Sequence, residues 1–436
     1  MPQVLNTRHG TFEADFRALL GQKREDSPDV DAAVAGIIAD VRARGDAAVI
    51  ELTRRFDRLD LTPETLAFSP AEIAAETAKV SAEDRAALEL AATRIRAYHA
   101  PQMPQDAEWT DAAGTRLGWR WTPVSAAGLY VPGGLASYPS SVLMNAIPAK
   151  VAGVGRLVVA CPTPGGQVNP LVLLAAQIAG VDQVLRIGGA QAIAALAYGT
   201  ETIPPVDKIT GPGNAYVAAA KRRVFGRVGI DMIAGPSEIL VIADSTGDPD
   251  WVALDLLAQA EHDQSAQSIL ITPDRALADA VMAAVEVRLQ TLARREIAGA
   301  SWRDFGAVIL CRDLDEAAAL SNRVAPEHLE LCVADPEALA SQITHAGAIF
   351  LGAWTPEAIG DYVGGPNHVL PTARSARFSS GLSVMDFVKR TTLARMTPAA
   401  LAAIGPAAER LAASEGLEAH GLSVSARLAR LNRAAP

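Results

Sequence analysis

Two short stretches carry side chains that could bind a metal ion or move a proton. The first is Gln259-Ala-Glu-His262. It ends a run in which apolar Leu254, Leu257 and Ala258 recur at three- to four-residue spacing, which predicts a helix with one buried face. Residues three apart project to the same side of a helix, so an amide oxygen and an imidazole become neighbours there. An isolated pair of this kind is more often only hydrogen-bonded, so metal binding requires ligands from elsewhere.

The second stretch is Pro326-Glu-His-Leu329, which enters a predicted strand. Neighbouring strand residues point to opposite faces, so Glu327 and His328 share a cleft only if the strand begins later. An adjacent carboxylate and imidazole then supply two acid–base groups, whereas a solvated loop pair supplies none. Downstream, Asp361 precedes the glycine-rich stretch Gly364-Gly-Pro-Asn-His368, and Glu415 and His420 lie in the last helical segment.

Composition limits the elements that can position these residues. A chain of 436 residues is long for one core, so two or more domains are expected. A net charge of -10 disfavours nucleic acid and anionic membrane surfaces as partners. Without a membrane-spanning apolar run or a signal-peptide pattern, a cytoplasmic location is expected. The three cysteines, Cys161, Cys311 and Cys332, lie in short apolar runs without CxxC spacing, which predicts buried thiols.

The chain is expected to form two α/β domains between helical ends. Residues 1–118 predict a helical lead-in, with helices at 30–44, 45–57, 70–79 and 82–100 and a candidate strand at 64–68. A first α/β domain is expected over 119–243, with strands at 127–130, 156–161, 184–187, 208–210 and 239–243 and helices between them. A second follows over 244–375, with strands at 268–272, 307–311, 328–333 and 348–351. Residues 376–436 predict a helical tail. Strands alternating with helices indicate mostly parallel, Rossmann-like sheets, so the fold class is α/β.

Three glycine clusters follow strands of the first α/β domain, and each opens a helix: Val131-Pro-Gly-Gly134, Gly188-Gly-Ala-Gln191 and Gly211-Pro-Gly-Asn214. Free backbone N–H groups at a helix start favour a phosphate. None completes a GxGxxG pattern, because Tyr216 occupies the last glycine position after Gly211. Each turn alone is weak support for a dinucleotide-binding site, but three such turns in one domain favour a bound dinucleotide.

Taken in order, these stretches resemble the histidinol dehydrogenase family. The resemblance runs from about residue 30 to the C-terminus. The stretches that carry it are Tyr130-Val-Pro-Gly-Gly134, Gly188-Gly-Ala-Gln-Ala192, Gly211-Pro-Gly-Asn-Ala-Tyr-Val217, Ala234-Gly-Pro-Ser-Glu238, Gln259-Ala-Glu-His262, Pro326-Glu-His-Leu329, Gly360-Asp-Tyr362, Asn367-His-Val-Leu-Pro371 and Glu415-Gly-Leu-Glu-Ala-His420.

The resemblance implies a zinc-dependent, NAD-linked enzyme that oxidises L-histidinol through L-histidinal to L-histidine with two NAD. It implies one zinc per subunit with ligands Gln259, His262, Asp361 and His420. It implies catalytic residues Glu327 and His328 and cofactor contacts Tyr130, Gln191 and Asn214. Substrate contacts would be Ser237 and Glu415 together with the zinc ligands and the catalytic pair. It further implies a homodimer in which Glu415 and His420 reach the partner's site.

The implied residue types suit that chemistry. Two imidazoles, a carboxylate and an amide oxygen suit zinc, and also manganese or cobalt. His328 is a base for the alcohol proton, and Glu327 would deprotonate the water that hydrates the aldehyde. A zinc hydrolase would use the same ligands but has no use for the glycine turns, and a binding protein would need no Glu-His pair. A related branch that acts on sulfonated diols shares much of the framework, so the retained Glu415 and His420 matter for the choice.

Overall fold

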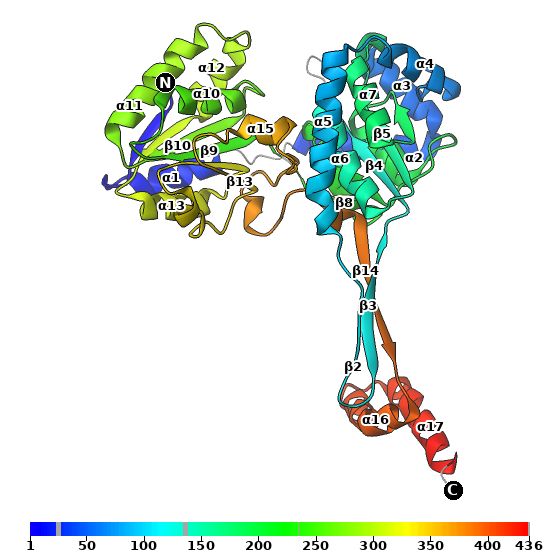
Figure 1. The fold of residues 1–436 in the computed structure, drawn as a ribbon. Coiled ribbons are helices and arrows are strands. Elements are labelled where there is room, and N and C mark those ends of the chain that lie inside the picture. The colour runs from blue at the N-terminus through cyan, green and yellow to red at the C-terminus, as the bar shows by residue number, and fades with distance from the viewer. Residues whose placement is uncertain (23–27, 134–137, 234, 435–436) are drawn as a thin grey trace. The chain divides into compact units, whose positions relative to one another are not determined.

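The computed structural model describes residues 1–22, 28–133, 138–233 and 235–434 (Figure 1). The chain divides into two compact units. Unit 1 comprises Met1–Gln102 and Val124–Phe387, and unit 2 comprises Met103–Pro123 and Val388–Pro436. Among the described helices, none combines the length and the apolar character needed to cross a membrane.

Unit 1 contains a five-stranded parallel sheet with the strand order β6-β5-β4-β7-β8. Its strands are β4 (Ala126–Tyr130), β5 (Arg156–Ala160), β6 (Gln183–Leu185), β7 (Lys208–Thr210) and β8 (Gly229–Ile230). The intervening helices are α6 (Pro139–Ala152), α7 (Pro170–Ala179), α8 (Gly189–Tyr198) and α9 (Ala215–Val224). Every residue of β4 is buried, as expected for a central strand covered on both faces.

The N-terminal helices complete the core of this sheet. They are α2 (Pro28–Arg44), α3 (Asp46–Asp57), α4 (Pro70–Thr77) and α5 (Ala82–His99). Val34, Val41 and Val49 from α2 and α3 share one buried cluster with Ile193 and Val217 from α8 and α9. The four predicted helices are therefore confirmed, and α2 and α3 cover the sheet. The candidate strand at 64–68 is wrong, because the chain forms a 3-10 turn at Pro63–Thr65 and a single bridge from Ala67 to Leu185.

Unit 1 also contains a six-stranded parallel sheet with the order β1-β11-β10-β9-β12-β13. Its strands are β1 (Gln3–Asn6), β9 (Glu238–Ala243), β10 (Gln267–Thr272), β11 (Ala307–Leu310), β12 (His328–Cys332) and β13 (Ala348–Leu351). Its helices are α1 (Phe12–Gly21), α10 (Pro249–Ala260), α11 (Arg275–Leu289), α12 (Arg295–Phe305), α13 (Leu314–Val324), α14 (Pro336–Ala340) and α15 (Glu357–Tyr362). Separate apolar clusters on its two faces contain residues of α1 and α13 and of α10, α11 and α12.

The mixed α/β fold with parallel sheets is as predicted. Two segments, however, belong to a different sheet from the one that the sequence predicted or were not predicted as strands. Residues 239–243 were predicted to end the first α/β domain. They instead form β9, which pairs with β10 and β12 in the six-stranded sheet. Likewise β1, in the segment predicted to be helical, pairs in parallel with β11. A buried apolar strand looks the same in either sheet, so the sequence pattern does not reveal which sheet it joins.

Unit 2 is an antiparallel sheet followed by two helices (Figure 1). The strand order is β14-β3-β2, with β2 at Ala107–Thr110, β3 at Arg116–Pro123 and β14 at Val388–Arg395. The helices are α16 (Pro398–Ser414) and α17 (Glu418–Ala434). The tail over 376–436 is therefore not entirely helical as predicted. All of β14 after Val388 is exposed, so it lacks the alternation of buried and exposed residues that would have revealed a strand.

Candidate active site

Glu327 and His328 lie at the start of β12, between β9 and β13, and both side chains are buried. Glu238, the first residue of β9, holds both of them. Its backbone N–H donates to Glu327 Oε2 at 2.9 Å, and its carbonyl oxygen lies 2.9 Å from His328 Nδ1. A carbonyl oxygen can only accept, so His328 carries its proton on Nδ1 and its Nε2 has a lone pair.

The two side chains lie together as the acid–base hypothesis requires. The strand begins at His328, so Glu327 precedes the alternation that would have turned it away. Glu327 Oε2 lies 3.8 Å from His328 Nδ1. The pair is therefore not a solvated loop pair, the alternative that the sequence left open.

The other imidazole nitrogen of His328 faces acidic groups of α15. His328 Nε2 has no hydrogen-bond partner among the described residues and lies 3.6 Å from Glu357 Oε1. Ligand atoms of His328, Glu357 and Asp361 all lie within 4.8 Å of one another. Burial lowers the pKa of His328 below its usual value, although the nearby Asp361 carboxylate opposes that shift. The imidazole is thus held as a neutral base.

Gln259 lies near the end of α10 and is completely buried, with 0% of its surface exposed. Neither its side-chain oxygen nor its side-chain nitrogen has a hydrogen-bond partner among the described residues. A buried amide left unpaired costs roughly 1–3 kcal/mol per group, and buried polar groups in native proteins normally have partners. The Gln259 amide is therefore a strong candidate for a ligand to a bound metal ion.

His262 follows α10 rather than extending it. The helix ends at Ala260, and the His262 backbone N–H donates to the Gln259 carbonyl oxygen at 3.2 Å in the turn. After the larger effect of burial, His262 is among the groups that lower the pKa of His328. The predicted helix is confirmed, but the predicted helical position of His262 is wrong.

Asp361 lies one turn after Glu357 in α15, and His368 lies beside it. Asp361 Oδ1 is 3.6 Å from His368 Nδ1, which faces the Asp361 carbonyl oxygen at 3.1 Å. His368 Nε2 lies 3.3 Å from Ser141 Oγ of α6, and the Asn367 side chain donates to the Met144 carbonyl oxygen at 2.6 Å. The glycine-rich stretch thus binds α6 and presents a second imidazole next to Asp361.

Ser237 precedes β9 and is half-buried, and its carbonyl oxygen accepts from the Gln267 backbone N–H at 3.0 Å. It is therefore the direct neighbour of Glu238, whose backbone holds Glu327 and His328. Two residues of the stretches that carried the resemblance, Gly134 and Ala234, lie outside the described residues.

Two of the three predicted cofactor residues meet at the start of α8, at the carboxyl end of the five-stranded sheet. The Gly189 backbone N–H donates to the Tyr130 hydroxyl at 3.1 Å. Gly189 has a φ of +62°, and a Cβ there would lie 2.8 Å from Gln191 Oε1. Burial raises the pKa of Tyr130 to about 12, so the hydroxyl stays protonated and able to donate.

The third predicted cofactor residue, Asn214, is exposed at the start of α9. Its side-chain oxygen accepts from the backbone N–H groups of Tyr216 and Val217 at 3.1 and 3.2 Å. Lys221 and Asp231 form a buried ion pair beside the loop that precedes Asn214. Lys221 Nζ donates to the Gly211 carbonyl oxygen, and Asp231 Oδ2 accepts from the Gly211 N–H, so the pair holds this loop from both sides. Gly211 has a φ of +106°, and a Cβ there would collide with the Tyr130 carbonyl oxygen. The Gly211 turn is therefore held in place by contacts with Lys221 and Asp231.

The remaining predicted site residues belong to unit 2. Glu415 ends α16 and His420 lies in the first turn of α17, and both side chains are exposed within that unit. The cysteines are free and buried, as predicted. Burial raises the pKa of Cys161 and of Cys311 to about 12, which leaves no reactive thiolate.

The sequence did not single out Glu238, Glu330 or Glu357, although all three are buried polar residues of the six-stranded sheet and its connections. His368 was named in a glycine-rich stretch and was among the histidines left for consideration as ligands, but it was assigned no role. Each lies within a few residues of a predicted site residue, which was the available signal. An imidazole base beside acidic groups at one sheet, with glycine turns at the strand ends of the other, is typical of α/β oxidoreductases.

Comparison with known proteins narrows this class. The chain matches the family model described as histidinol dehydrogenase over residues 20–428. A histidinol dehydrogenase from Cereibacter sphaeroides is 84% identical over 432 residues, which cover 99% of this chain and 100% of the relative. One from Ruegeria pomeroyi is 80% identical with the same coverage. The crystal structure of histidinol dehydrogenase from Elizabethkingia anophelis matches with a TM-score of 0.94 and 38% identity over 99% of each chain. The chain belongs to the histidinol dehydrogenase family.

Proposed function

We propose that the protein is an L-histidinol dehydrogenase that oxidises L-histidinol through L-histidinal to L-histidine, reducing two NAD, as the last steps of histidine biosynthesis in the cytoplasm. The observation that best supports the proposal is the buried Glu327–His328 pair, with both side chains anchored to the backbone of Glu238. This anchoring leaves the lone pair of His328 Nε2 directed away from β9 and toward the acidic groups of α15.

In the first oxidation, His328 Nε2 takes the proton of the substrate hydroxyl while the hydride on the same carbon passes to NAD. The neutral imidazole required for this step is favoured by its burial, which lowers its pKa. A positioned base of this kind typically contributes about 10²- to 10⁴-fold to the rate. The products of this step are L-histidinal, NADH and a protonated His328.

In the second oxidation, Glu327 takes a proton from the water that adds to the aldehyde carbon. With that proton on Glu327, the hydrated aldehyde is left as an anion, which loses its hydride to a second NAD and becomes a carboxylic acid. Glu327 is suited to this role because the Glu238 N–H fixes its carboxylate 3.8 Å from the His328 ring. The two residues therefore act on different oxygens of the same carbon.

Gln259, His262 and Asp361 would hold a zinc ion together with His420, one ion per subunit. The unpaired buried amide of Gln259 fits such a ligand set, and so does the Asp361 carboxylate within 4.8 Å of the catalytic imidazole. Bound zinc would hold the nitrogens of the substrate and so orient its alcohol carbon. The remaining substrate contacts would be Ser237 and Glu415.

NAD would bind at the glycine turns that follow β4, β6 and β7, against Tyr130, Gln191 and Asn214. In open parallel sheets, ligands bind outside the carboxyl ends of the strands. There the backbone N–H groups of loops and helix starts donate hydrogen bonds to phosphate. The buried ion pair that fixes Gly211 keeps one of these turns in place without a ligand.

The functional protein would be a homodimer in which Glu415 and His420 complete the partner's site. Both side chains are exposed in unit 2, whose helices follow a two-stranded pairing of β3 and β14 that is eight residues long. At about 3.4 Å per residue, such a pair extends roughly 27 Å. An arm of that length supports the proposal that the exposed side chains of unit 2 extend to another chain.

The direct test is to mix the purified protein with L-histidinol, NAD and zinc and to follow NADH absorbance. We expect two NADH per L-histidinol and L-histidine as the product. A sulfonated diol offered in place of L-histidinol is the matched control. Absence of NADH with L-histidinol, or a preference for the sulfonated diol, would refute the proposal.

A further inference from the structure

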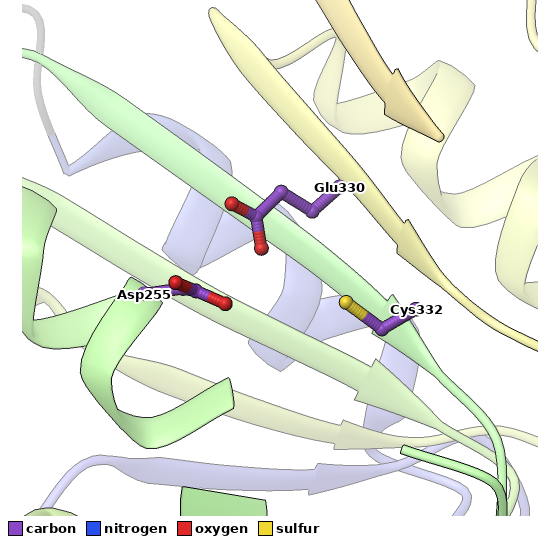
Figure 2. Close-up of side chains that lie close together, drawn as sticks. All are labelled: Asp255, Glu330 and Cys332. Carbon is purple, nitrogen blue, oxygen red and sulfur yellow. The ribbon is translucent and has the colours of Figure 1, made fainter. Parts of the chain in front are cut away.

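A second group of acidic side chains lies beneath the catalytic residues. Asp255 of α10 and Glu330 and Cys332 of β12 turn their polar atoms toward one another, all within 4.8 Å (Figure 2). His328, Glu330 and Cys332 alternate along β12 and therefore share one face of the sheet. Glu330 is only 1% exposed, so its carboxyl group needs a structural reason to be there.

Glu330 binds the start of the helix that carries Asp361. Its Oε1 accepts a hydrogen bond of 2.6 Å from the backbone N–H of Glu357, the first residue of α15. The preceding residue, Pro356, supplies no side-chain cap for that N–H. A side chain of β12 therefore fixes the position of α15.

Glu330 also faces Asp255 of α10, and carboxyl oxygens of the two side chains lie within 4.8 Å of each other. Two buried carboxyl groups this close avoid mutual repulsion when one of them retains a proton. Glu330 Oε2 has no hydrogen-bond partner among the described residues. Burial raises the pKa of Asp255 to about 6 and that of Glu330 well above its usual range, so the pair keeps this proton near neutral pH.

The positions of these residues along their elements match those of the proposed site. Asp255 lies four residues before Gln259 in α10, and Glu357 lies four residues before Asp361 in α15. Residues four apart lie one above the other on a helix face. Glu330 lies two residues after His328 on the same face of β12. The carboxyl pair thus links α10, β12 and α15 about one turn below the proposed ligands.

We infer that Asp255 and Glu330 are positioning residues, which fix α10 and α15 against β12 and so hold Gln259 and Asp361 at the geometry that metal binding requires. They touch neither substrate nor metal and act through the elements that carry the ligands. This inference rests on the proposed function for the identity of the metal ligands. The role of Asp255 and Glu330, which lie outside the proposed site, is new.

The test measures zinc affinity of the purified full-length protein by competition with a chelator. Asp255→Ala and Glu330→Leu remove one side of the pair, and we expect each to weaken zinc binding about 10- to 100-fold, as is typical for outer-shell partners of metal ligands. Glu330→Gln can still accept from the Glu357 N–H and donate to Asp255. It should therefore stay close to the wild type, which separates a positioning role from a need for charge.

Cys332→Ala is the matched control, because it removes a buried side chain of the same cluster that makes neither link. We expect lower stability but unchanged zinc affinity. Equal weakening in Cys332→Ala, or unchanged affinity in both Asp255→Ala and Glu330→Leu, would overturn the inference. So would a second zinc per chain that is lost in Cys332→Ala, since the cluster would then be a metal site itself. These affinities can be read even if L-histidinol proves not to be the substrate, so the two proposals fail separately.

Discussion

Replacing Gln259 by methionine should change the stability of the protein in opposite directions with and without metal. The side-chain amide of Gln259 is buried, and neither its oxygen nor its nitrogen has a partner among the described residues. Each unpaired group costs roughly 1–3 kcal/mol. Methionine has a similar shape and no such groups, and volume-conserving core changes usually cost less than about 1.5 kcal/mol. Two such groups cost roughly 2–6 kcal/mol, so after a packing loss of up to about 1.5 kcal/mol Gln259→Met should stabilise the metal-free protein by roughly 0.5–6 kcal/mol.

With zinc in enough excess that its stabilisation of the wild type exceeds the gain of the variant in chelator, the order should reverse. A ligand at a hundred times its dissociation constant stabilises the folded state by about 2.7 kcal/mol, and the variant loses this gain together with the ligand. Urea unfolding in chelator and in zinc, followed by the midpoint and slope, measures both differences. Gln267→Met is the matched control, because the buried Gln267 amide donates to the Phe305 carbonyl oxygen. That variant should be less stable in both conditions.

A Gln259→Met protein that is less stable than the wild type in chelator would refute this reasoning. The amide would then have a partner in the metal-free protein, and its burial would no longer indicate a metal ligand. A variant that is stabilised in chelator but still gains the wild-type increment from zinc would remove Gln259 from the ligand set while keeping the physical account of its burial.

Three further predictions test the site. Glu327→Gln should mainly slow oxidation of supplied L-histidinal and His328→Asn oxidation of L-histidinol, each by about 10²- to 10⁴-fold in stopped-flow NADH assays; equal losses in both would contradict the division of roles. His262→Asn should lose zinc on dialysis, and unchanged zinc by elemental analysis would remove it from the ligand set. Inactive His262→Asn and His420→Asn should regain activity when refolded together, since a heterodimer has one intact site; no recovery despite demonstrated heterodimers would show that each chain supplies its own His420.

The sequence predicted most of the elements because helices and strands with one buried face carry a periodic pattern. The pattern cannot show which sheet a strand joins, and β9 was therefore placed in the other α/β domain. It also failed for β3 and β14, whose pairing leaves most of both strands partly or fully exposed. Antiparallel pairing between residues 116–123 and 388–395 spans most of the chain, and no local signal reports it.

The sequence predicted those parts of the candidate site that can be recognised from the chemistry of the side chains alone. An adjacent carboxylate and imidazole can be recognised in a sequence, but the partners that orient them cannot when those partners are backbone groups. Glu238 orients Glu327 and His328 through its N–H and carbonyl oxygen, which every residue type except proline would offer. The carboxyl groups of Asp255 and Glu330 escaped notice for a related reason. Their role depends on which residues of α10, β12 and α15 lie beside them in the fold.

The orientation of the His328 imidazole therefore depends on strand register. His328 pairs with Ile239, so the carbonyl of Glu238 lies where Nδ1 can reach it. A shift of one residue would turn the side chains of β9 to the opposite face and take both anchoring groups away from the pair. Buried apolar residues on both faces of β9 prevent that shift, since Leu240 and Ile242 pack in one cluster and Ile239 and Val241 in the other. The packing of the sheet thus decides which nitrogen of His328 faces the Glu238 carbonyl oxygen and which keeps its lone pair.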